Sequence, residues 1–160
     1  MSVNATVTVD EIYSSEVMPL GSIYVDKSTG KRYRFIYNAG STTFNVGCLT
    51  FRTATDDNVT CSTNGSFAAR CLPAGIAISA IPTTKYGYIQ VYGIADEVLT
   101  NGDDDIAKGA LIVGASNVSG LCDSIAPGEA LTSLTPFKFG AAVTADVNAS
   151  NTVAVFLELD

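Results

Sequence analysis

The chain has 160 residues, 47% of them hydrophobic and 16% charged, a balance that excludes an intrinsically disordered protein. Its formal net charge of −7 at pH 7 argues against nucleic acid as a partner, because phosphate binding requires a clustered cationic surface. No apolar run of about 18 residues occurs, so the sequence predicts no membrane span and no membrane partner.

The sequence predicts a single β domain over residues 21–160, preceded by an N-terminal arm of residues 1–20. In the arm, valines alternate weakly with polar residues, and Asp10 is then placed to cap a short helical turn over residues 11–17. Such a mixed pattern predicts no stable strand or long helix. We therefore expect a partner to order the arm.

The clearest early element is a β-hairpin, with strands at residues 22–25 and 31–37. Gly30 lies in the connecting turn and supplies the positive φ that such turns need. Because side chains alternate along a strand, the second strand has an aromatic face and a basic face. The aromatic face contains Tyr33, Phe35 and Tyr37, and the basic face contains Arg32 and Arg34. The pattern predicts a half-buried strand whose outer face is basic.

The core is predicted in the middle of the chain. Strands at residues 72–81 and 86–95 carry apolar and aromatic residues in both phases, which indicates that both of their faces are covered. Gly87 and Gly93 interrupt the second of these strands and predict a bulge or the close approach of another backbone. A further short strand is expected around residues 44–51.

The other predicted elements are short. The polar stretch 52–70 is interpreted as a loop with one short strand near residues 59–61. An acidic loop covers residues 96–105, followed by a strand at residues 107–113 and a brief helical turn at residues 127–134.

The last predicted element is a hairpin with strands at residues 137–147 and 152–159. In its final strand, alternate apolar residues form a core-facing side: Val153, Val155, Leu157 and Leu159. No segment has a sustained helical period. The sequence therefore predicts an all-β fold, a compact β-barrel or β-sandwich of short antiparallel strands with at most one or two short helical turns.

The charged residues are unevenly distributed. Residues 27–52 include five basic and no acidic side chains, whereas residues 96–105 include five acidic and no basic ones. Two interpretations stay open: opposite patches that pack against an asymmetric protein surface, or two solvated loops of opposite sign.

The sequence predicts a protein that is not an enzyme and that has no cofactor. It contains no histidine, which removes the commonest general base and metal ligand. The four cysteines, Cys48, Cys61, Cys71 and Cys122, include no C-x-x-C pair, so a zinc site is not expected. A disulfide between Cys61 and Cys71 is one alternative, and buried reduced thiols are the favoured one. Residues 101–105 offer carboxylates to calcium, but their spacing favours a solvated turn.

Several segments resemble a pattern found in small head proteins of tailed bacteriophages. The resemblance includes GKRYRFIYNAG at residues 30–40, LPAGIA at residues 72–77 and YGYIQVYG at residues 86–93. FGAA at residues 139–142 and the alternating final strand extend it over most of the β domain. Tyr88 departs from the pattern, in which tryptophan is usual at that position.

This resemblance implies a capsid decoration protein, also called a cement protein. Such a protein is made in the host cytoplasm, sits on the outer surface of the virion capsid, and locks neighbouring subunits of the major capsid protein together. The implied partners are the major capsid protein and other copies of the chain, with a homotrimer favoured. The alternatives are a receptor- or glycan-binding β module of a virion fibre, or another structural subunit of the head or tail.

Contact with the capsid is expected from the arm and from the basic stretch that begins at the hairpin. The expected contact residues are Val3, Val7, Val9, Ile12, Tyr13, Lys31, Arg32, Arg34 and Arg52. An arm of this kind could add a strand to a loop of the capsid.

Overall fold

The computed structural model describes residues 8–53, 56–62, 72–102, 105–115, 119–125, 138–146 and 151–159, with backbone only for residues 56–62. These residues form strands, turns and irregular segments but no helix, so the predicted all-β fold is confirmed. Within the same ranges no helix is long and apolar enough to cross a membrane.

Ten strands form one hydrogen-bonded sheet, and β2 pairs with both β4 and β6 in addition to β1. The strands are β1 (Ile23–Val25), β2 (Arg32–Asn38), β3 (Leu49–Thr53), β4 (Asp56–Ser62), β5 (Pro73–Ala77), β6 (Tyr86–Leu99), β7 (Leu111–Gly114), β8 (Cys122–Ile125), β9 (Gly140–Ala142) and β10 (Thr152–Glu158). Their order is β1-β2-β4-β3-β5-β6-β10-β9-β7-β8, and every pair except β2–β4 is antiparallel. The sheet as a whole does not close into a barrel, because β1 and β8 lie at its two ends.

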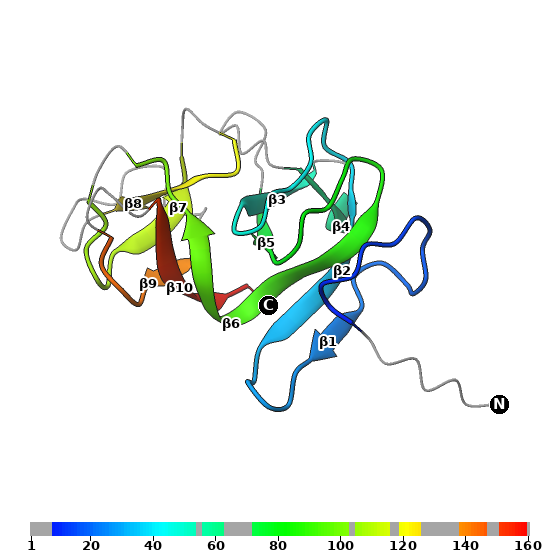
Figure 1. Ribbon diagram of the computed structural model, residues 1–160, viewed down its shortest axis with the longest axis horizontal. Coiled ribbons are helices and arrows are strands. Elements are labelled where there is room, and N and C mark those ends of the chain that lie inside the picture. The colour runs from blue at the N-terminus through cyan, green and yellow to red at the C-terminus, as the bar shows by residue number, and fades with distance from the viewer. Residues whose placement is uncertain are drawn as a thin grey trace.

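β6 joins the two halves of the molecule. Its first half pairs with β2 and β5, and its second half pairs with β10. Figure 1 shows β6 as the long green strand, with β1–β5 on one side and β7–β10 on the other. Gly93 has a φ of +90° where the two halves meet, and a Cβ at Gly87 would lie 2.8 Å from the Ile81 side chain. The special position expected at Gly93 is therefore confirmed, since the Lys31 Cα would lie 3.4 Å from a Cβ there, whereas at Gly87 the prediction was wrong, because this glycine keeps regular register with Ile36 and makes room for a side chain.

The predicted acidic loop begins later than expected. β6 continues through Asp96 and Glu97 to Leu99, because Val98 is fully buried and pairs with Val153 of β10. Placing Asp96 and Glu97 in a loop was wrong, since an exposed carboxylate on a strand is compatible with burial of its neighbours.

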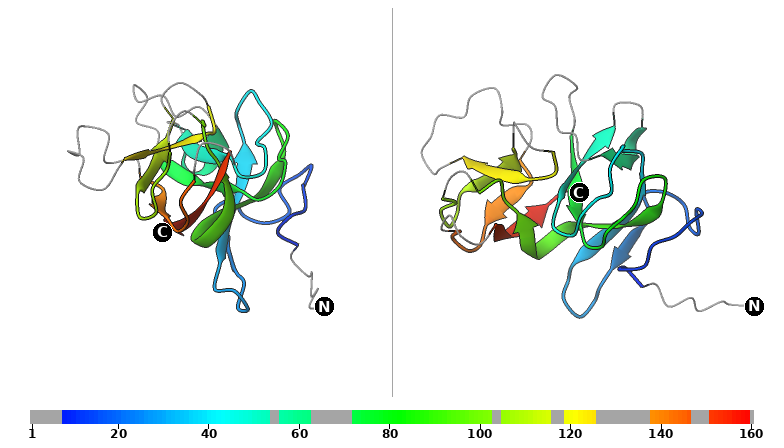
Figure 2. Two further views of the ribbon diagram at one scale, coloured as in Figure 1. Left: turned by 60° about the vertical axis from the view of Figure 1, so that its left-hand side comes forward. Right: turned by 45° about the horizontal axis from the view of Figure 1, so that its top comes forward.

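The predicted first hairpin is confirmed. β1 and β2 pair in antiparallel register, and Gly30 in the turn has a φ of +72°. The Asp26 carboxylate accepts hydrogen bonds from the Thr29 hydroxyl at 2.6 Å, the Ser28 hydroxyl at 2.7 Å and the Ser28 amide at 2.9 Å, and these bonds lower the pKa of Asp26 to about 2. Figure 2 shows this turn projecting away from the other strands in both views.

The basic outer face predicted for β2 is only partly present. Arg34 is 9% exposed and pairs in register with Ile89, a fully buried core residue. At this point both faces of β2 are covered, since Ile36, on the same face as Arg34, is buried in one apolar cluster and Phe35, on the other face, is buried in the aromatic cluster described next. The prediction of a basic face was therefore wrong for Arg34.

Residues 8–20 of the arm pack against the aromatic cluster, which is formed by Tyr33, Phe35 and Tyr88. Tyr13 exchanges two backbone hydrogen bonds with Tyr86, at 2.9 and 3.0 Å, and the Tyr88 hydroxyl donates to the Met18 sulfur. The helical turn predicted at residues 11–17 was wrong, because Tyr13 takes an extended, strand-paired conformation. The second predicted turn, at residues 127–134, lies outside the described residues.

The C-terminal hairpin and its core-facing side are confirmed. β10 pairs with β9, and Val153, Val155 and Leu157 are buried in the larger apolar cluster, against which Leu159 packs. The strand expected near residues 59–61 lies within β4, whereas β8 was not predicted.

Two of the four cysteines act as small core residues. Cys48 and Cys122 are buried free thiols, and burial raises the pKa of each to about 12. The possible Cys61–Cys71 disulfide lies outside the described side chains. Reduced, buried thiols, the favoured alternative, are confirmed for Cys48 and Cys122.

We expect these two thiols to resist alkylation in the folded protein. A pKa of about 12 leaves only about one thiolate in 10,000 at pH 8, and the thiolate is the reactive form. Iodoacetamide at pH 8, followed by peptide mapping, should label Cys48 and Cys122 at least about a hundredfold more slowly in native protein than in guanidinium chloride. Equal rates in the two states would contradict the buried environment.

Candidate functional site

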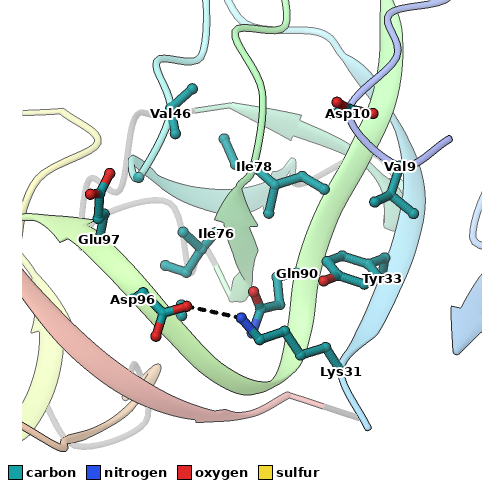
Figure 3. Close-up of a pocket in the computed structure, with 13 residues that line it drawn as sticks. Val9, Asp10, Lys31, Tyr33, Val46, Ile76, Ile78, Gln90, Asp96 and Glu97 are labelled. Carbon is teal, nitrogen blue, oxygen red and sulfur yellow. Dashed lines mark hydrogen bonds and ion pairs between the residues drawn. The ribbon is translucent and has the colours of Figure 1, made fainter. Parts of the chain in front are cut away.

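Two surface features stand out as candidate binding sites. The first is a cleft of about 560 Å³, here called the β5–β6 cleft. Its walls come from segments far apart in the sequence: Val9 of the arm, Val46 before β3, and Ile76 and Ile78 at and after the end of β5. Figure 3 shows these apolar side chains surrounding the opening.

The β5–β6 cleft has an acidic rim. Asp10, Asp96 and Glu97 line it together with a single basic residue, Lys31. The Lys31 ammonium lies 3.0 Å from the Asp96 carboxylate, and the two side chains are 23% and 73% exposed. Figure 3 shows the carboxylates of Asp10 and Glu97 on opposite sides of the opening. At this exposure the Lys31–Asp96 pair contributes little to stability, but it orients Lys31 along the cleft.

The second feature is an apolar stripe, formed by Ile23, Val25, Tyr92, Ile94 and Phe156 with the single basic residue Arg32 between Val25 and Tyr92. Residues directly opposite each other in paired strands share a face. Val25 pairs with Arg32, Arg32 with Tyr92, and Phe156 with Ile94. The stripe therefore crosses β1, β2, β6 and β10 on one side of the sheet.

Ring contacts join the parts of the stripe that lie on β2, β6 and β10. The Arg32 guanidinium carbon lies 4.8 Å from the centre of the Tyr92 ring, within the range of a cation–π interaction. The rings of Tyr92 and Phe156 meet edge to face, with centres 5.6 Å apart. Beside Phe156 is a groove of about 210 Å³, lined also by Leu111 and Ala141.

The structure separates the predicted contact residues instead of gathering them on one surface. Val9 and Lys31 line the β5–β6 cleft, whereas Arg32 lies in the apolar stripe on the other face of β2. Ile12 and Tyr13 are half-buried against the body of the protein. The contact role of these residues stays a prediction.

The remaining predicted contact residues are less accessible or not described. Arg34 is buried in β2, and Arg52 is half-buried in β3, which pairs with β4 and β5. Val3 and Val7 lie outside the described residues.

Sequence reasoning missed the apolar stripe. Phe156 stands in the outward phase of β10, between the buried Val155 and Leu157, and remains 39% exposed. A large aromatic residue in that phase, where a polar residue is usual on a solvated face, was the signal that could have revealed the surface.

The described residues include no group of three cysteine or acidic side chains close enough to hold a metal ion. The features that distinguish the two candidate sites are their shape, their apolar surface and their charge. Comparisons of the chain with protein-family models, with curated proteins and with solved structures gave no match.

Proposed function

We propose that this protein is a virion structural subunit that binds the outer surface of the major capsid shell and stabilises it, as a decoration protein. The apolar stripe is the observation that carries the proposal. Contiguous apolar surface on a soluble protein marks a contact with another protein, whereas scattered apolar residues do not. The identity of the partner rests on the sequence resemblance to tailed-phage head proteins.

The composition of the apolar stripe suits a stable protein contact. Tyrosine and arginine are common hot spots at protein interfaces, where phenylalanine is also enriched, and Tyr92 contacts both Arg32 and Phe156 here. Because these three residues lie on paired strands, their side chains are held in place before binding. A rigid surface of this kind supports a mechanical role, in which the bound protein resists the separation of capsid subunits.

The β1–β2 hairpin is part of the proposed capsid contact, because it contributes residues to the apolar stripe. Arg32 lies within the stripe, and the hairpin turn projects beside β1. Association of several copies, with a trimer favoured, belongs to the same proposal. Copies arranged around one axis would each present a stripe to the shell.

Binding to empty shells tests the proposal. Purified protein is mixed with expanded, undecorated shells, assembled from the major capsid protein of the genome that encodes the chain. We expect the wild-type protein to cosediment with the shells and to raise the temperature at which they break. Replacing both Ile94 and Phe156 by threonine should weaken binding at least about tenfold, because it removes apolar contact area and keeps β propensity.

A matched control uses an exposed apolar residue outside the stripe. Leu72 is 45% exposed just before β5, outside both the stripe and the arm, so Leu72→Thr should bind shells as the wild type does. Undiminished binding by the double variant would exclude the stripe as the contact. Failure of the wild-type protein to bind shells would overturn the function itself.

The groove beside Phe156 favours one alternative, a glycan-binding module of a virion fibre. An exposed aromatic ring next to Lys138 and Glu158 offers a stacking surface with polar neighbours. A glycan array with a reproducible hit that Phe156→Thr abolishes, together with no shell binding, would support this alternative.

A further inference from the structure

The shape of the β5–β6 cleft suits one long side chain with its flanking backbone. Its volume of about 560 Å³ exceeds the size of a single residue, and its walls are apolar at Val46, Ile76 and Ile78. Apolar walls of this kind pack against the methylene stem of a long charged side chain and leave the charged head at the rim.

The charges of the cleft are unbalanced. Three carboxylates face one ammonium group, and only Asp96 is engaged, by Lys31 at 3.0 Å. In the part of the chain that the structure describes, neither Asp10 nor Glu97 forms an ion pair. The net charge of −7 would also attract a cationic partner over a longer range.

Lys31 already shows how the cleft receives a cation. Its stem lies against the bend of β6, since a Cβ placed on Gly93 would be 3.3 Å from the Lys31 Cγ. The ammonium group then reaches the carboxylate of Asp96. A second cation entering from solvent would meet Glu97 on one side of the opening and Asp10 on the other (Figure 3).

The arrangement fits a guanidinium group better than a metal ion. Carboxylates on opposite sides of an opening do not converge on one point, and the described residues include no group of three that could hold a metal. A planar guanidinium needs no converging ligand set, because its fork of N–H donors pairs with a single rim carboxylate such as Glu97 while its stem packs against the apolar walls. We propose that the β5–β6 cleft binds an arginine side chain presented by an extended segment of a protein partner.

This proposal is independent of shell binding through the apolar stripe, because Lys31 and Tyr33 lie on the cleft side of β2 and Arg32 lies on the stripe side. The probe is a blocked pentapeptide with a central arginine flanked by valines, titrated into ¹⁵N-labelled full-length protein and followed by NMR. We expect the amides of Gly47, Ile78 and Glu97 to shift. The same peptide with citrulline, which is neutral and nearly isosteric, should bind at least about tenfold more weakly.

Charge variants locate the interaction. Glu97→Gln should weaken binding of the arginine peptide severalfold, whereas Asp105→Asn removes an exposed acid outside the cleft and should leave binding unchanged. Equal binding of the citrulline peptide would overturn the proposal, as would shifts confined to residues outside the cleft. Arginine amide that binds as tightly as the peptide would overturn the requirement for a protein segment.

Discussion

Replacing Phe35 by alanine should lower the free energy of unfolding by about 3–5 kcal/mol, the usual range for removing a buried aromatic ring. Phe35 is fully buried at the centre of the aromatic cluster. Its ring centre lies 5.2 Å from that of Tyr88, 5.8 Å from Tyr13 and 6.0 Å from Tyr86. The substitution therefore removes contacts with β6 and with the arm at the same time. Equilibrium denaturation in urea measures the loss as a lower midpoint with an unchanged slope.

Phe156→Ala is the matched control for this prediction. It deletes the same ring from a strand position that is 39% exposed, so it leaves no closed cavity. We expect its cost to stay below about 1.5 kcal/mol, since much of the ring is already in contact with water. A Phe35→Ala cost no greater than that of Phe156→Ala would contradict the packing of the arm and β6 around Phe35.

The packing of the arm changes how a truncation should be designed. Removing residues 1–20 would uncover Phe35 and Tyr88, so any loss of shell binding would combine lost stability with lost contact. Removing residues 1–7 leaves the packing of residues 8–20 intact. Comparing the two truncations for stability and for shell binding separates the structural role of the arm from its predicted role as a capsid contact.

The sequence predicted those parts of the fold that depend on neighbouring residues. The first hairpin follows from Gly30 and from the alternation of residues 31–37, and the buried side of β10 follows from period two alone. Both features depend on local backbone geometry. The chain contains the information for them within a few residues.

The parts that sequence reasoning missed depend on contacts between distant segments. Arg34 of β2 lies between Ile23 of β1 and Ile89 of β6, and its side chain is buried. The alternation of residues within β2 does not reveal these distant neighbours, so the burial of Arg34 could not be inferred from the strand itself. Tyr13 joins Tyr86, more than seventy residues later, and that pairing replaces the predicted helical turn. The same holds for both candidate sites, since the cleft and the stripe each combine segments that are distant in sequence.

Replacing Gly47 by alanine should also destabilise the fold strongly, because two hydrogen bonds fix the position of Gly47 and the backbone of Glu97 leaves no room for a side chain. The Gly47 amide donates to the Ala77 carbonyl at 2.8 Å, and its carbonyl accepts from the Leu99 amide at 2.9 Å. Its φ is +81°, and a Cβ there would collide with the backbone carbonyl oxygen of Glu97. Gly47→Ala should therefore lower the free energy of unfolding by about 3 kcal/mol or more, from the left-handed backbone and the overpacking together.

Gly109→Ala separates these two contributions. Gly109 has a similar φ, +86°, but a Cβ there would have no atom within 4 Å. Alanine at position 109 should cost only the backbone term, about 1 kcal/mol, measured by the same urea denaturation. The difference between the two variants measures the collision with Glu97, which belongs to the stretch of β6 that the sequence assigned to a loop. Equal losses of unfolding free energy in the two variants would mean that the Glu97 backbone can move away from Gly47. The end of β6, which carries the acidic rim of the cleft, would then not be held in place by the loop before β3.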